Sequence, residues 1–150
     1  MKTKYGFTLV ELVIVMAVIA LILSIAIPNF RGMQQEGQLT QVEGELSTIK
    51  SAVISYWKNH EFEYPANIHT ALTGTSPAVI TRVLDDPFKT DTTNNTYGYI
   101  TGNDTTFGHY FIVYTKGPRG DTLPTWNATE QKVHYSGSGL AVSSAPVEKD

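Results

Sequence analysis

The chain has 150 residues, a formal net charge of −3 and no cysteine. A chain of this length suits one domain, and the lack of cysteine excludes disulfides, thiolate chemistry and cysteine-ligated zinc. The 11 basic and 14 acidic residues include no Lys/Arg cluster, so the electrostatic footprint of a nucleic-acid-binding protein is missing. We therefore predict no nucleic-acid partner.

A predominantly apolar run occupies residues 7–27, in which 18 of the 21 residues are apolar and Glu11 is the only charged one. As a helix this run would be about 31 Å long, which matches a bilayer hydrocarbon core of about 30 Å. Lys2 and Lys4 precede the run. The positive-inside rule then predicts that the amino end stays in the cytoplasm and that the rest of the chain lies outside.

Two ordinary interpretations of this run leave Glu11 without a purpose. A signal peptide could be cleaved near residues 24–26, where a small-x-small pattern occurs, so that the mature chain would begin at Ile27. A plain anchor would keep residues 1–6 and tether a monomeric binding module to the membrane. In either case a carboxylate would enter the bilayer without a partner, which costs on the order of a few kcal/mol on membrane-insertion scales.

A third interpretation follows from residues 6–11, which read Gly-Phe-Thr-Leu-Val-Glu and resemble the processing site of type IV prepilins. The resemblance implies that a prepilin peptidase cuts after Gly6 and that the new amine of Phe7 is methylated. Glu11 would then pair with the Phe7 amine of a neighbouring subunit. Each charge is costly alone in an apolar core and tolerable as a pair, so the pair would set the axial register of the subunits.

The same resemblance assigns assembly roles to Leu9, Val10 and Pro28. Leu9 and Val10 begin the apolar surface that would pack in the filament core. Pro28 ends the apolar run at an offset where family members often carry a proline, and proline removes a helical hydrogen bond. Because glycines follow as well, we expect the weakest helix between residues 27 and 37. The alternative is a simple boundary between a membrane segment and a separate helix.

The resemblance also implies partners and a location. The partners would be other copies of the chain in a helical filament, minor pilins or pseudopilins, the peptidase, an inner-membrane platform and an assembly ATPase. The subunit would first cross the inner membrane once with its head outside the cytoplasm, and would then join a periplasmic or extracellular filament. We expect no enzymatic activity, since the sequence shows no nucleophile motif, Walker loop or paired-carboxylate signature.

After Gly37 the apolar residues recur at alternating spacings of three and four, which predicts an amphipathic helix that ends near Asn59 and His60. A short helical turn is expected at residues 68–72. The residues of the apolar stripe are Leu39, Val42, Leu46, Ile49, Val53 and Tyr56.

Strands are predicted in the remaining third of the chain, at residues 97–101, 109–115 and 131–136, because aromatic and β-branched residues are concentrated there. A turn is expected at residues 102–104, and the polar tail 143–150 is expected to fray. A long helix followed by a small antiparallel sheet of three to four strands is an α+β, pilin-like layout. The expected divisions are a leader (1–6), a transmembrane or filament-core half-helix (7–27), a kinked linker with an amphipathic half-helix (28–60), and a globular head (61–150).

The head resembles the major pseudopilin of type II secretion systems, with a type IV pilus pilin, major or minor, as the alternative. The resemblance rests on Tyr64-Pro65 after the helix, on the Asp-Pro-aromatic motif at residues 86–88, and on the strand and Gly-rich loop at residues 114–121.

Major pseudopilins bind calcium in the loop after this strand, which would make Asp121 and Glu130 the candidate ligands here. One departure weakens that implication, because Arg119 stands where the family usually has an aspartate. Calcium requires six to eight oxygen ligands, and the alternative is a calcium-free loop held by its own turns. The four histidines show no metal-ligand spacing, so no other cofactor is predicted.

Overall fold

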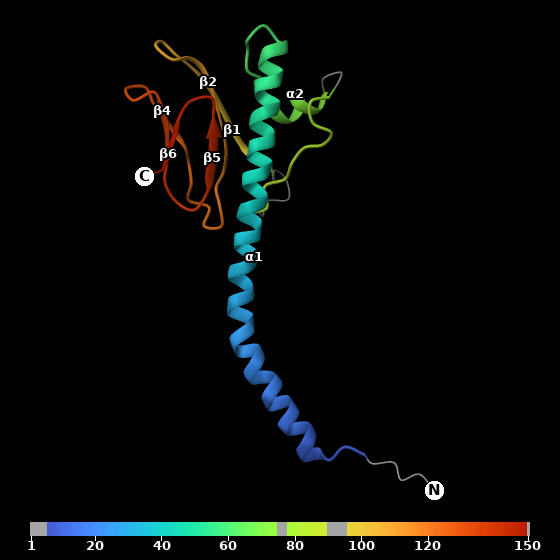
Figure 1. The fold of residues 1–150 in the computed structure, drawn as a ribbon. Helices are drawn as coiled ribbons and strands as arrows, with labels where there is room; N and C mark the ends of the chain where they lie inside the picture. The colour runs from blue at the N-terminus through green and yellow to red at the C-terminus, as the bar shows by residue number, and fades with distance from the viewer. Residues whose placement is uncertain (1–5, 75–77, 90–95, 150) are drawn as a thin grey trace. The chain divides into compact units, whose positions relative to one another are not determined.

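The structure is a computed structural model that describes residues 6–74, 78–89 and 96–149. Residues 1–5 of the predicted leader, including both lysines, lie outside the described residues. Two helices, α1 (Leu9–Asn59) and α2 (Ile68–Gly74), come before the strands in the chain (Figure 1). The strands are β1 (Gly98–Asp104), β2 (Gly108–Thr115), β3 (Thr125–Asn127), β4 (Lys132–Tyr135), β5 (Leu140–Ser143) and β6 (Val147–Lys149).

The chain divides into two compact units, Met1–Gly37 and Gln38–Asp150, and α1 contributes residues to both. The boundary coincides with the start of the apolar stripe that follows Gly37 in the sequence. We call Gln38–Asp150 the head unit. It differs from the predicted head (61–150) because it includes the amphipathic half of α1.

The amphipathic half of α1 supplies one wall of the core of the head unit. Its predicted stripe is confirmed, and α1 ends at Asn59 as expected. Burial of each large aliphatic side chain contributes about 1.5–3 kcal/mol, so this stripe is a main source of the head's stability. The fully buried stripe residues are Val42, Leu46, Ile49 and Val53, and they pack with Ile68 and Leu72 of α2 and with Tyr97, Phe111 and Val113.

The first sheet has the strand order β1–β2–β5, and both pairings are antiparallel. Strand β2 is central and buries three successive residues, Phe111, Ile112 and Val113. It is also the clearest strand in the sequence, because its β-branched and aromatic residues suit a pleated, buried surface. The α+β layout of a long helix on a small antiparallel sheet is therefore confirmed.

A second sheet, with the order β3–β4–β6, extends this layout. Its β3–β4 pair is antiparallel and its β4–β6 pair is parallel. The expectation of a frayed tail is wrong for the described residues: Ser143 and Ala145 are buried, and the Val133 N–H donates to the carbonyl of Pro146 at 2.9 Å. Backbone pairing holds this polar segment, which hydrophobicity alone does not predict.

The predicted turn at residues 102–104 is also displaced. Strand β1 continues to Asp104, and the turn occupies residues 105–107. The Asp104 carboxylate accepts the backbone N–H groups of Thr106 and Phe107, both at 2.9 Å. Gly108 then adopts a φ of 87°, which favours glycine. Asp104 thus begins the turn rather than lying inside it.

Candidate functional site: the amino-terminal half of α1

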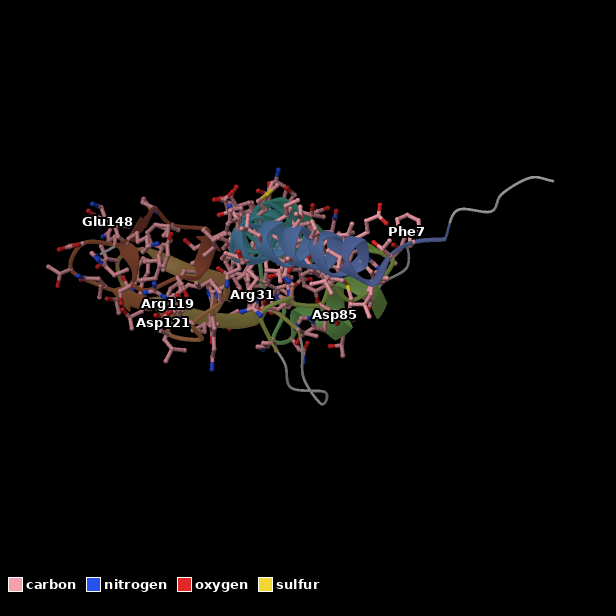
Figure 2. The ribbon with its side chains drawn as sticks, turned by 90° about the horizontal axis from the view of Figure 1, so that it is seen from below. Phe7, Arg31, Asp85, Arg119, Asp121 and Glu148 are labelled. Carbon is pink, nitrogen blue, oxygen red and sulfur yellow. The ribbon has the colours of Figure 1, made fainter. Side chains whose placement is uncertain are left out.

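Every described residue of the first unit is exposed, from Gly6 to Gly37. Phe7 is 85 % exposed, and Leu21, in the middle of the apolar run, is 65 % exposed. Figure 2 shows Phe7 at the amino-terminal end of the helix. A helix that is apolar on all sides is stable when surrounded by lipid or by other protein, but not in water. This segment of α1 therefore requires a partner that the isolated chain does not supply.

Length and composition make α1 a candidate membrane span, and it is the one such helix among the residues that the structure describes. None of its most apolar window is buried against the rest of the chain. Signal sequences pass the same test, as do core helices of soluble proteins, although those are mostly buried. The exposure seen here excludes the core-helix interpretation for this part of α1.

The start of α1 is closed by reciprocal hydrogen bonds between Thr8 and Glu11. The Glu11 backbone N–H donates to Thr8 Oγ1 at 3.2 Å, while Glu11 Oε2 accepts from the Thr8 N–H at 3.1 Å and from its hydroxyl at 3.0 Å. This is a capping box, with threonine at the N-cap and glutamate three residues later. The sequence interpretation missed it, although the Thr-x-x-Glu spacing is a recognised signal.

The capping box changes how Glu11 must be understood. Sequence reasoning found no partner for this carboxylate within its own chain, but Thr8 provides one. The Glu11 carboxylate accepts both of its hydrogen bonds from Thr8 through Oε2. An ionised carboxylate can accept about four hydrogen bonds, so capping leaves the second oxygen, Oε1, able to accept a further donor. Glu11 can thus serve a helix start and an intersubunit contact together.

Pro28 lies inside α1, whose backbone is helical throughout residues 28–37. The alternative of a boundary between two separate helices is therefore wrong. Without an N–H, Pro28 cannot donate to the carbonyl of Ser24, and α1 lacks one helical hydrogen bond there. A lower local stability in this stretch stays a prediction.

The loop proposed to hold calcium is tied to the segment that precedes β5. Asp121 Oδ1 accepts the Ser138 N–H at 3.0 Å and the Ser138 hydroxyl at 2.9 Å. The Arg119 N–H donates to Ser138 Oγ at 3.1 Å, and Arg119 and Asp121 lie close together in the loop (Figure 2). Glu130 instead has its Oε2 2.6 Å from His134 Nε2. The two candidate calcium ligands thus have different protein partners, and calcium binding stays a prediction.

The Asp-Pro-Phe motif has a structural role in the head. Asp86 is 1 % exposed, and its Oδ2 accepts the Thr115 hydroxyl at 2.7 Å. Its Oδ1 accepts the Phe88 N–H at 3.0 Å, and Thr115 Oγ1 accepts the Gly117 N–H at 3.2 Å. Asp86 therefore joins the segment before β1 to the end of β2.

Comparison with known proteins supports the interpretation of the amino terminus. The family described as "Prokaryotic N-terminal methylation motif" matches residues 1–27. A "Fimbrial protein" of Pseudomonas aeruginosa is 42 % identical over 55 residues, which are 37 % of this chain and 36 % of the relative. The "Type IV major alpha-pilin" of Moraxella bovis is 43 % identical over 53 residues, 35 % of this chain and 33 % of the relative.

A third relative, the "ComG operon protein 3 homolog" of Bacillus licheniformis, is 35 % identical over 60 residues, which are 40 % of this chain and 62 % of the relative. No solved structure matches the chain significantly. The chain thus matches about a third of the length of its fimbrial relatives, whose names describe pilins rather than enzymes. The amino-terminal segment of this protein is type IV pilin-like and carries the N-terminal methylation motif.

Proposed function

We propose that this chain is a structural subunit of a type IV filament, processed after Gly6 and assembled through the amino-terminal half of α1. The observation that carries the proposal is that the helical run up to residue 27 is apolar apart from a few residues, is exposed, and holds a single carboxylate, Glu11, near its start. Apolar surface gains about 25 cal/mol per Å² when it leaves water. A membrane would cover this surface before assembly, and the same helix of neighbouring subunits would cover it afterwards.

Glu11 would then contribute twice. Within the subunit it caps α1 through Thr8, which reduces the cost of holding a carboxylate near the membrane. Between subunits its second oxygen would accept the methylated Phe7 amine of a neighbour. A charge that is buried in an apolar surrounding without its partner is strongly destabilising. A subunit in the wrong axial register would leave such a charge, and its incorporation would be disfavoured. The capping box and the pair are compatible because they use different oxygens.

Two substitutions at Glu11 separate these contributions. Glu11→Gln keeps an acceptor at the third helical position, where glutamine also completes a capping box, but it removes the charge. Glu11→Ala removes both. We expect both variants to be cleaved normally and to give little or no sheared filament. Filament yield and precursor size on an immunoblot measure the two steps separately.

The matched control is Glu43→Gln, which removes an exposed carboxylate from the amphipathic half of the same helix and should assemble normally. Normal filament yield from Glu11→Gln together with failure of Glu11→Ala would reduce Glu11 to a helix cap. Normal yield from both variants would refute the charge-pair account.

Within this class we propose a pseudopilus of the type II secretion kind. Support comes from the head, where the Asp86 motif and the Gly-rich loop after β2 resemble major pseudopilins. The fimbrial relatives favour the second candidate, a type IV pilus pilin, major or minor. Deletion of the gene in its host distinguishes the two: a secretion pseudopilin is required for protein export, whereas a pilus pilin is required for long surface filaments.

The proposal also carries partners and an orientation. A prepilin peptidase would remove the leader, and an inner-membrane platform with its ATPase would extract the subunit from the membrane. The head unit would lie outside the cytoplasm. Protease added to spheroplasts should therefore degrade the head while the membrane protects the apolar half of α1, and protection of the head would contradict this orientation.

A further inference from the structure

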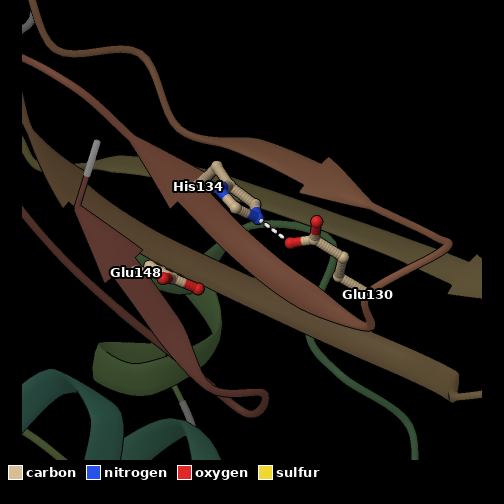
Figure 3. Close-up of side chains that lie close together, drawn as sticks. All are labelled: Glu130, His134 and Glu148. Atoms are coloured by element: carbon tan, nitrogen blue, oxygen red, sulfur yellow. Dashed lines mark hydrogen bonds and ion pairs between the residues drawn. The ribbon is translucent and has the colours of Figure 1, made fainter.

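A group of metal-ligating side chains lies on the second sheet and the turn before β4. Glu130, His134 and Glu148 place a ligand atom each within 4.8 Å of one another. His134 Nε2 and Glu130 Oε2 are 2.6 Å apart, and the Glu148 side chain lies near this pair, below it in the view of Figure 3. The three residues are separate in the sequence, which explains why sequence reasoning named Glu130 alone.

The fold builds this group from three segments. Glu130 belongs to the turn between β3 and β4, where Asn127 Oδ1 accepts the N–H groups of Thr129 at 3.0 Å and Glu130 at 3.2 Å. His134 lies in β4, directly opposite Glu148 of β6 in the parallel register. Directly paired residues of neighbouring strands present their side chains on the same face of the sheet. Turn and register together thus bring the three ligands to one place.

We propose that Glu130, His134 and Glu148 bind a divalent transition-metal ion, with Zn²⁺ as the best-suited one. An imidazole nitrogen and two carboxylate oxygens are Zn²⁺ ligands at about 2.0–2.2 Å, and a tetrahedral ion separates its ligand atoms by about 3.3 Å. Rotations of exposed glutamate side chains bring the present atoms to that spacing. The ion would replace the hydrogen bond between His134 and Glu130, whose proton would pass to the solvent, and a water would complete its coordination.

The charges around the group favour a cation. Two carboxylates are opposed by one ammonium, since Lys132 Nζ pairs with Glu148 Oε2 at 2.9 Å. The imidazole directs the choice of ion, because Ca²⁺ requires six to eight oxygen ligands whereas imidazole suits zinc and its neighbours. A bound ion would join β6 to β4 and to the preceding turn, and would stabilise the carboxyl-terminal part of the head against unfolding.

The test titrates the detergent-solubilised full chain with ZnCl₂ alone in a calorimeter. We expect saturable binding of one ion per chain and a rise in melting temperature on adding Zn²⁺. His134→Gln should weaken binding by at least about tenfold, the size of effect known for groups that merely support metal ligands. Glu148→Gln should also weaken it, which guards against a folding defect in one variant.

His60→Gln is the matched control, because His60 is an exposed histidine with Glu61 and Glu63 beside it in the sequence. We expect this variant to bind like the wild type, and Lys132→Gln to bind more tightly because it removes the competing ammonium. The proposal is overturned if the wild type does not bind Zn²⁺, if His60→Gln and His134→Gln lose affinity equally, or if equimolar Ca²⁺ displaces the ion.

Discussion

The two parts of α1 bury their apolar residues in different ways. Leu46 is 1 % exposed and belongs to the core cluster of the head unit, whereas Leu21 of the same helix is 65 % exposed. The first belongs to a stripe that recurs every three or four residues, and the second to an apolar surface on all sides. One helix thus stabilises the fold at one end and requires a membrane or other subunits at the other.

The largest effect should come from separating these parts. A chain that begins at Gln38 retains the whole buried core of the head, which runs from Val42 to Ala145. We expect it to be a soluble, folded monomer that forms no filaments. Gel filtration and circular dichroism test this. An unfolded or aggregated product would show that the head depends on the first unit.

Leucine-to-alanine substitutions in the two parts should affect different properties. Leu46→Ala leaves a cavity in a buried site, so it should lower the unfolding free energy of the head by about 2–5 kcal/mol. Leu21→Ala, its matched control, should leave that free energy unchanged and reduce assembly instead. Urea titration measures the first effect and sheared filament yield the second. Equal destabilisation by both variants would contradict the division.

An intermediate effect is expected at Asp86. Asp86→Ala deprives the buried Thr115 hydroxyl and the Phe88 N–H of their acceptor, which should cost about 1–3 kcal/mol of unfolding free energy. Asp85→Ala changes the exposed neighbour in the same segment and should cost much less. Chemical denaturation of both variants tests this. Similar losses would mean that the Asp86–Thr115 hydrogen bond does not hold the loop to β2.

The smallest expected effect is on how the stability of the head changes at acidic pH. Backbone N–H donors lower the pKa of Asp104, through Phe107 and Thr106, and that of Asp121, through Ser138. A carboxyl group whose pKa is lowered by folding stabilises the head above its unfolded value of about 3.9, and this contribution is lost as the pH falls through the lowered pKa.

The double variant Asp104→Asn/Asp121→Asn should therefore lose less stability than the wild type between pH 5 and pH 2, about the range in which such carboxyls titrate. Glu61→Gln, an exposed carboxylate elsewhere in the head, serves as the control and should follow the wild type. Urea unfolding at a series of pH values measures this, and parallel curves for all three chains would contradict it.

Periodicity was sufficient for the elements with long repeats. The stripe from Val42 to Val53 and the run of aromatic and β-branched residues in β2 predicted their elements well, because each pattern extends over several turns or residue pairs. Strands β3, β5 and β6 have three or four residues each. They were missed because segments this short carry little periodicity, and because β5 and β6 are held by pairing with β2 and β4, which lie well before them in the chain.

The candidate sites divide in the same way. Gly6, Phe7 and Glu11 lie within six consecutive residues, so a local motif sufficed to suggest their roles, although the capping role of Thr8 was overlooked. Glu130, His134 and Glu148 become neighbours only through the turn before β4 and the parallel β4–β6 register, which the sequence does not reveal. Tertiary register, not residue type, was the missing information.

The central claim is that the amino-terminal half of α1 is a processed assembly element rather than a signal peptide or a plain anchor. Mass spectrometry of the mature amino terminus, purified from the native host, tests it most directly. Processing after Gly6 predicts a chain that begins with Phe7 and carries one methyl group on its amine. A chain that begins at Met1 or at Ile27 would contradict the account.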